Sequence, residues 1–143
     1  MIEQSNFEKL IKDIQKKIDK DEEATYSKKV IYEYRNPTFF GNIKNPDASA
    51  TIKGSCGDTM RIDIKIKNYI ISDIRFWTDG CGPSVASGNM LSKMMIGKSL
   101  KQAKNFTKKQ LLDSLDGLPK ENLHCSKLAI DTLHLSINNY LNK

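Results

Sequence analysis

Near its middle the chain reads Met60-Arg61-Ile62-Asp63-Ile64-Lys65-Ile66-Lys67, and apolar and charged residues alternate there without a break. Successive side chains of a strand point to opposite faces of a sheet. This stretch therefore predicts an antiparallel strand whose apolar residues, Met60 to Ile66, line a buried face, and whose charged residues face solvent. Asn68-Tyr69 is expected to form the tip of a hairpin that turns the chain back along this strand.

The return strand is predicted over residues 70–78, with Ile70, Ile74 and Phe76 on one face. A short, half-apolar strand is predicted at residues 50–52, before the alternating stretch. Neither strand is followed by a helix and a parallel strand, so the three are expected to form one antiparallel sheet.

Helical patterns flank these strands, and most show apolar residues at spacings of three and four. They are predicted over residues 26–35, from Pro83 to Gly97, from two capping boxes at Ser99 and Thr107, and over residues 123–141. The fold class expected from this order is α+β, with a three-stranded antiparallel sheet packed against helices.

The N-terminal segment, residues 1–24, is predicted to be a helical extension, and residues 25–143 a separate domain. Ser5 and Glu8 match a capping box, and the acidic run from Asp19 to Glu23 is expected to act as a hinge. The extension has one apolar stripe of five residues: Phe7, Leu10, Ile11, Ile14 and Ile18. The stripe must pack on something, either its own domain or a partner, and the sequence leaves both open.

Composition describes one domain's worth of chain, with 143 residues, 38% hydrophobic and 28% charged. No apolar run approaches the roughly 18 residues that span a membrane, and no apolar core of a signal peptide is present. A cytoplasmic location is therefore expected. The three cysteines cannot all pair within one chain, so in a reducing compartment they point to ligands or reactive thiols.

The cysteines lie in short, chemically distinctive stretches. Cys56 is followed by Gly57-Asp58, Cys81 lies between two glycines, and Cys125 follows His124. Helix N-termini carry partial positive charge, which favours a thiolate. Cys81 precedes the helix predicted from Pro83, and Cys125 lies in the first turn of the last predicted helix, so both are expected to gain from this effect. Three thiolates with a carboxylate and an imidazole suit zinc or an iron–sulfur cluster better than hard cations.

Either centre takes four ligands, so the fourth here must be the oxygen of Asp58 or the nitrogen of His124. A carboxylate is a hard and exchangeable ligand for a soft centre. A cluster held this way is expected to be labile, which suits a protein that builds clusters and hands them on. No Cys-x-x-Cys pair is present, so a zinc finger is not supported.

At these residues the chain resembles the NifU/IscU-type iron–sulfur cluster assembly scaffold family. The resemblance runs from about Tyr26 to Lys143. It rests on a set of short motifs in order: Asn36-Pro37, Ser55-Cys56-Gly57-Asp58, Gly80-Cys81-Gly82, Gly97-Lys98-Ser99-Leu100, and His124-Cys125-Ser126.

The resemblance implies a scaffold, not a turnover enzyme, that takes sulfur from a cysteine desulfurase, assembles a [2Fe–2S] cluster with iron, and passes it to apo iron–sulfur proteins. By position, Cys56, Cys81 and Cys125 match the ligand cysteines, and Asp58 and His124 the auxiliary ligands. Cys125 matches the residue that receives persulfide sulfur, and Asp58 would ease cluster release. Zinc can occupy the same site, and the protein is expected to be a monomer or dimer.

One departure from the family pattern concerns chaperone docking. Many members carry Leu-Pro-Pro-Val-Lys before the His-Cys pair, where this chain has Leu118-Pro119-Lys120-Glu121-Asn122, so docking by that route is not expected. Two alternatives stay open. One is a SufU-like, zinc-dependent sulfur acceptor, although that branch generally lacks the histidine before the last cysteine. The other is a zinc-stabilised domain that touches nucleic acid, for which the net charge of +6 is the main support.

Overall fold

The computed structural model describes residues 2–143, with side chains from residue 4 onward. The sheet contains β1 (Ala48–Lys53), β2 (Thr59–Lys67) and β3 (Ile70–Thr78) in the order β1-β2-β3, and both pairs are antiparallel. β2 is the central strand, as its unbroken alternation predicted. The α+β fold with a three-stranded antiparallel sheet is confirmed.

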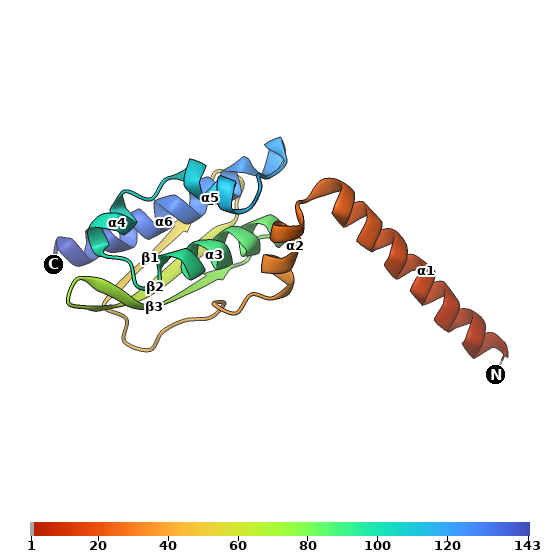
Figure 1. Cartoon of the computed structure of the whole chain (residues 1–143). Helices are drawn as coiled ribbons and strands as arrows, with labels where there is room; N and C mark the ends of the chain where they lie inside the picture. The colour runs from red at the N-terminus through yellow and green to blue at the C-terminus, as the bar shows by residue number, and fades with distance from the viewer. Residues whose placement is uncertain (1) are drawn as a thin grey trace.

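Helices cover one face of this sheet (Figure 1). Helix α3 (Gly82–Met95) lies against β3, and α6 (Leu123–Leu141) lies against β1 and β2. The short α4 (Leu100–Lys104) and α5 (Lys108–Ser114) pack against α6. Both short helices begin with the predicted capping boxes, at Ser99 with Gln102 and at Thr107 with Gln110.

The core lies between the sheet and these helices. Met60, Ile62 and Ile64 of β2 are fully buried there, together with Phe76 of β3. Helix α3 approaches the sheet closely at Gly88, where an added Cβ atom would stand 2.4 Å from the ring of Phe76. A residue with a side chain at position 88 would therefore force α3 away from the sheet.

The return strand differs from its prediction at its first residues. Ile71, and not Ile70, is buried, because the ladder skips Ser72: Lys65 pairs with Asp73 and Ile66 with Ile71. A bulge of this kind moves the following or preceding side chains to the opposite face. Ile70 is consequently 44% exposed.

The second face of the sheet is covered in part by the irregular connection of residues 36–47. Its backbone runs beside β3 at Phe40, and the N–H of Ile43 donates to the carboxylate of Asp63 at 3.0 Å. Asp63 was predicted to face solvent but is buried, since it also accepts from Ser49 Oγ at 2.7 Å and Arg61 Nε at 2.8 Å.

The N-terminal helices differ from the sequence prediction in their bounds. Helix α1 (Ile2–Thr25) is continuous, so the expected capping box at Ser5 and the expected hinge from Asp19 to Glu23 are both wrong. The helical segment is interrupted instead at Ser27, whose hydroxyl caps α2 (Lys28–Arg35). α1 projects away from the rest of the molecule (Figure 1). No helix within residues 2–143 is both long and apolar enough to cross a membrane.

Candidate metal centre

The turn between β1 and β2 carries the first two candidate ligands. The N–H of Gly54 donates to the carbonyl of Asp58 at 2.7 Å, and the N–H of Gly57 donates back to Gly54 at 3.0 Å. Gly57 has a φ of +94°, which a residue with a side chain rarely adopts. This tight turn presents Cys56 to solvent and directs Asp58 toward α3.

The start of α3 carries the third candidate. Cys81 is the N-cap of the helix and is exposed, and Pro83 occupies the first turn, as predicted. Gly80 precedes Cys81 in a crowded position. A Cβ atom at Gly80 would lie 2.6 Å from Ser84 Oγ and 2.8 Å from Asp58 Oδ2, so only glycine lets the two elements meet.

The first turn of α6 supplies the last two candidate ligands. A single 3-10 turn, η1 (Lys120–Asn122), leads directly into α6, which places His124 and Cys125 side by side at its start. The sulfur of Cys125 lies 3.6 Å from Nε2 of His124.

Three of these residues converge closely. A donor atom from each of Cys56, Asp58 and His124 lies within 4.8 Å of the other two. A shallow cavity of about 330 Å³ opens beside them between the turn and α6, and Cys56 and His124 line it. Residues 68 positions apart in the sequence therefore meet at one end of the molecule, next to solvent.

Cys81 and Cys125 fall outside that close group and differ from each other in exposure. Cys81 is exposed, whereas Cys125 is 1% exposed. Ser84 connects Cys125 to the group: its Oγ lies 3.3 Å from Cys125 Sγ and 3.3 Å from Asp58 Oδ2. A hydroxyl has one hydrogen, so Ser84 donates to one of these acceptors at a time.

Burial raises the pKa of the Cys125 thiol to about 11. The hydrogen bond from Ser84 lowers this pKa in part, while negative charge at Cys81, Cys56 and Asp58 raises it further. The expectation that the helix N-terminus would favour the thiolate at Cys125 is therefore wrong for the protein without a metal. Its proton must be displaced by a nearby cation before the sulfur can act as a ligand.

Two tyrosines stand on the Cys81 side of the site. Burial raises the pKa of the Tyr26 phenol, and negative charge at Cys81 and Cys125 raises it further. Tyr26 meets Tyr34 edge to face, with ring centroids 6.2 Å apart. Gly82 leaves room for Tyr34, whose ring would come within 3.1 Å of an added Cβ atom.

Sequence reasoning missed Ser84 and the steric role of Gly80. Ser84 is fully buried and touches two candidate ligands, yet a serine in the first turn of a helix is too common to attract notice. The available signal was its spacing: it lies three residues after Cys81, on the same face of α3.

The donor set determines what the arrangement can hold. Cysteine sulfur and histidine nitrogen are ligands for zinc and for iron–sulfur clusters, and four such ligands complete either centre. Cys56, Asp58, His124 and Cys125 together offer that number, and Cys81 stands at the adjacent helix end. The residues present therefore fit such a group.

Comparisons with known proteins show the family to which the chain belongs. The family model described as the NifU-like N terminal domain matches residues 25–143. The chain is 42% identical over 123 residues to the iron–sulfur cluster assembly scaffold protein IscU of Buchnera aphidicola subsp. Baizongia pistaciae, covering 82% of this chain and 97% of that protein. It is 40% identical over 119 residues to IscU 1 of Archaeoglobus fulgidus, covering 82% of this chain and 78% of that protein.

A solved structure of a similar protein has a similar fold. The crystal structure of a candidate iron–sulfur cluster assembly scaffold protein for the SUF system, from Fervidobacterium islandicum, superposes with a TM-score of 0.64 at 25% identity, over 78% of this chain and 96% of that one. The order of the motifs, the fold and these matches lead to one conclusion: the chain belongs to the NifU/IscU family, through its NifU-like N-terminal domain.

Proposed function

We propose that this protein is a scaffold on which [2Fe–2S] clusters are assembled and from which they are transferred to apo iron–sulfur proteins. The cluster is its cargo, and the protein acts as a carrier, not as a turnover enzyme. The observation that carries the proposal is the convergence of Cys56, Asp58 and His124 within 4.8 Å, beside Cys125, in a chain of this family.

The ligand roles follow from the donor chemistry. Cys56, Cys81 and Cys125 would supply thiolates to the two irons, and either Asp58 or His124 would complete the set. A carboxylate binds iron in a sulfur-rich centre less firmly than a thiolate does. Asp58 is therefore assigned to ligand exchange during cluster release. A more firmly bound ligand at this position would slow that release.

Cys125 is assigned as the acceptor of sulfur from a cysteine desulfurase. Its thiolate would attack the outer sulfur of the desulfurase persulfide; a new S–S bond forms on Cys125, and the desulfurase cysteine leaves as a thiolate. Two electrons from an external reductant would then convert each persulfide to the sulfide that a cluster needs. Because Cys125 is buried, this transfer requires the site to open locally, whereas Cys56 and Cys81 are already exposed. A cytoplasmic location, where thiols stay reduced, suits this chemistry.

Anaerobic reconstitution tests the proposal. Full-length protein is incubated with ferrous iron, cysteine, a reductant and a catalytic amount of desulfurase, and visible absorption and Mössbauer spectra are recorded. Wild-type protein is expected to form a [2Fe–2S] chromophore. Cys125→Ser is expected to form none and to carry no persulfide by mass spectrometry. A normal chromophore in that variant would overturn the assignment of Cys125.

Asp58→Ala gives the complementary result. This variant is expected to form the cluster and to retain it at least tenfold longer when an apo-ferredoxin is added. Asp113→Ala, a change of the same type on an exposed residue of α5, is the control and should transfer at the wild-type rate. Faster release from Asp58→Ala than from wild type would contradict the role given to Asp58.

A second candidate function is that of a zinc-dependent sulfur acceptor. The similarity to the SUF-system structure favours it, as does a donor set that would complete a tetrahedral zinc site. The two functions separate in one experiment. Zinc that iron and sulfide cannot displace, together with persulfide on Cys125, supports the acceptor; replacement of zinc by a chromophore supports the scaffold.

A further inference from the structure

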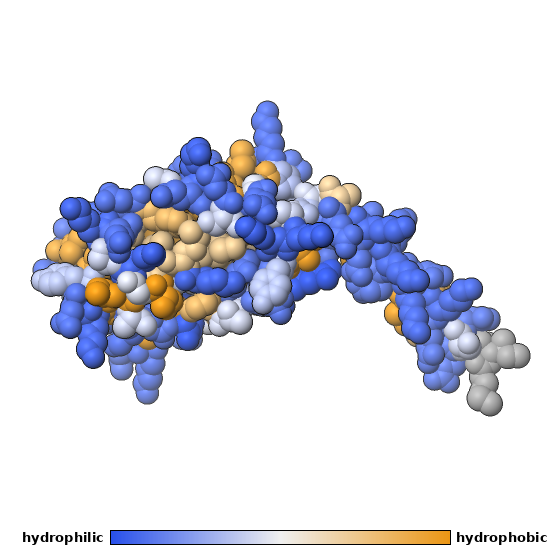
Figure 2. All heavy atoms as spheres, in the orientation of Figure 1, coloured by the Kyte–Doolittle hydropathy of each residue, from blue (hydrophilic) through white to orange (hydrophobic). Residues whose placement is uncertain are grey.

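Helix α1 exposes an apolar stripe that the rest of the described chain leaves uncovered. Phe7, Leu10, Ile11, Ile14 and Ile18 are each between 46% and 61% exposed. Figure 2 shows apolar atoms on one side of an otherwise hydrophilic helix. Contiguous apolar residues of this kind mark an interaction surface more often than isolated ones do.

The ion pairs that hold α1 to the body lie near its C-terminal end. Arg35 of α2 pairs with Asp19 at 3.1 Å and also with Glu22. These acids lie beside the stripe, so the ion pairs orient the helix without covering its apolar side.

The spacing of the stripe indicates the kind of partner. Phe7, Ile11, Ile14 and Ile18 are separated by four, three and four residues, which is the spacing of a coiled-coil seam. The same seam continues to Gln4 on one side and Asp21 on the other. Leu10 widens the stripe on one flank of this seam, and the regular four–three–four spacing of the other four residues favours another helix as the partner.

We propose that a second copy of this chain covers the stripe, through antiparallel pairing of the two α1 helices. In the register centred between residues 12 and 13, Phe7 packs against Ile18 of the second copy, and Ile11 against Ile14 of the second copy. Every apolar seam residue then meets an apolar one. At each end Gln4 meets Asp21 of the second copy, a pair of side chains that can hydrogen-bond.

Charge selects this arrangement over parallel pairing. A parallel pair would bring Asp21 against Asp21 of the second copy within the seam. It would also place the two bodies at the same end of the pair, and each body, residues 25–143, carries 18 basic and 10 acidic side chains, a net charge of +8. The antiparallel pair separates the bodies by about 36 Å, the length of the 24-residue helix at ~1.5 Å per residue, and aligns opposite helix dipoles.

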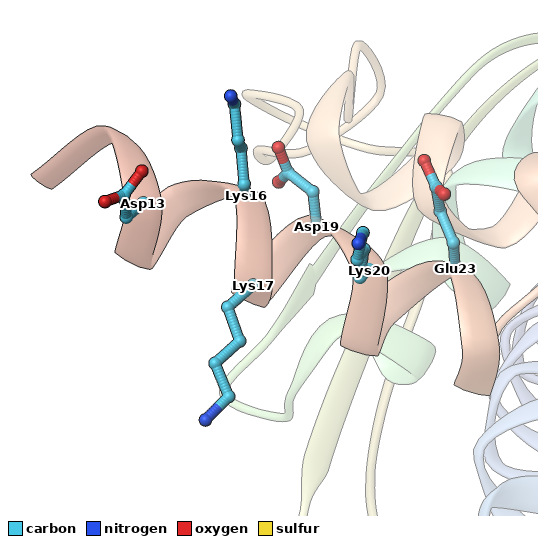
Figure 3. A pocket seen from close by; sticks show the side chains of 6 residues that line it. All are labelled: Asp13, Lys16, Lys17, Asp19, Lys20 and Glu23. Atoms are coloured by element: carbon cyan, nitrogen blue, oxygen red, sulfur yellow. The ribbon is translucent and has the colours of Figure 1, made fainter. Parts of the chain in front are cut away.

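The charges on the other face of α1 argue against two competing partners, an anionic membrane and a nucleic acid. Figure 3 shows that the shallow hollow on this helix is lined by charged side chains alone, with three lysines and three acids: Asp13, Lys16, Lys17, Asp19, Lys20 and Glu23. Residues 1–24 carry five lysines and seven acids, a net charge of −2. An anionic membrane or a nucleic acid would be repelled by that net negative charge, whereas a second α1 helix presents lysines as well as acids to its partner.

Sedimentation equilibrium of the metal-free, reduced full-length chain tests the proposal. The wild type is expected to have a concentration-dependent mass that approaches twice the 16.2 kDa of one chain. Ile14→Lys is expected to remain at the monomer mass, and Lys16→Ala, on the polar face, to behave as the wild type. The circular dichroism spectrum of a chain without α1 is subtracted from that of Ile14→Lys. The difference checks that α1 remains helical in the variant.

Orientation is tested by cross-linking an equal mixture of ¹⁴N- and ¹⁵N-labelled protein at its lysines. The antiparallel pair is expected to give mixed-isotope links between Lys9 and Lys16, and none between two copies of Lys20. A wild-type chain that stays monomeric, a trimer, an Ile14→Lys variant that still dimerises, or mixed-isotope Lys20–Lys20 links would each overturn the proposal. Because the test uses no metal, its outcome is independent of the scaffold function.

Discussion

The hydroxyl oxygen of Ser84 lies 3.3 Å from the sulfur of Cys125, although 41 residues separate them in the chain. The same oxygen lies 3.3 Å from Asp58. One side chain on α3 thus contacts both a thiol in the first turn of α6 and a carboxylate just before β2.

Ser84→Ala is expected to weaken zinc binding about tenfold, since removing a partner that orients metal ligands typically costs 10- to 100-fold in affinity. The free energy of unfolding should fall by about 1 kcal/mol for the lost hydrogen bond. Competition with a chromophoric zinc chelator measures the affinity. Ser92→Ala is the matched control: Ser92 is equally buried on α3 but donates to Gly88 within the helix, at 2.8 Å. That control should lose similar stability and keep its zinc affinity.

Gly88→Ala is expected to destabilise the fold by about 1–3 kcal/mol, because overpacking a filled core forces neighbouring atoms apart. The added Cβ would stand 2.4 Å from the ring of Phe76, so α3 must shift away from the sheet. Urea unfolding followed by circular dichroism measures the change. Gly54→Ala adds the same methyl group where the nearest atom, on Leu128, is 3.4 Å away, and it should be nearly neutral. Equal midpoints for the two variants would contradict the close approach.

Asp63→Ala is expected to lower the free energy of unfolding by about 1–3 kcal/mol, since it leaves the N–H of Ile43 and the hydroxyl of Ser49 without their acceptor. The connection of residues 36–47 should then loosen, which hydrogen exchange at Ile43 would detect. Lys65→Ala removes a surface ion pair with Asp47 and should cost no more than about 1 kcal/mol. Protection of the Ile43 amide that is unchanged in Asp63→Ala would argue against this anchor.

Deleting residues 1–24 tests our proposal that they form an extension separate from the domain of residues 25–143. The truncated chain is expected to keep the thermal unfolding midpoint and the zinc affinity of the full chain at low protein concentration, because α1 meets the body mainly through Arg35. Differential scanning fluorimetry and chelator competition provide the measurements. Loss of cooperative unfolding would show that α1 is part of the folded core.

The sequence predicted the sheet well, because strict alternation in β2 and a two-residue hairpin are local signals. The prediction was wrong where tertiary contacts determine which side chains are buried. The bulge at Ser72 moves Ile70 out of the core and Ile71 into it. The alternation of apolar and polar residues does not by itself predict where a residue is inserted in a strand. Asp63 is buried only because a distant connection crosses its face.

The sequence predicts which residues belong to the candidate site but not how they are arranged. Thiols next to glycine, aspartate and histidine mark the residues from the sequence alone. Which of them meet depends on packing: Cys56, Asp58 and His124 form one close group, Cys125 contacts only His124 of that group, and Cys81 lies outside it. Burial of Cys125 beneath the helix start could not be inferred, and it reversed the direction expected for the pKa of its thiol.

The position of His124 and Cys125 in the first turn of α6, after the other candidate donors, has a consequence for synthesis. Cys56 and Cys81 leave the ribosome well before α6 exists, and without α6 neither β1 nor β2 has its covering layer. A nascent chain therefore cannot present all five candidate donors until residues 124 and 125 have been translated. Assembly on the complete donor set is in this way confined to chains in which α6 has formed.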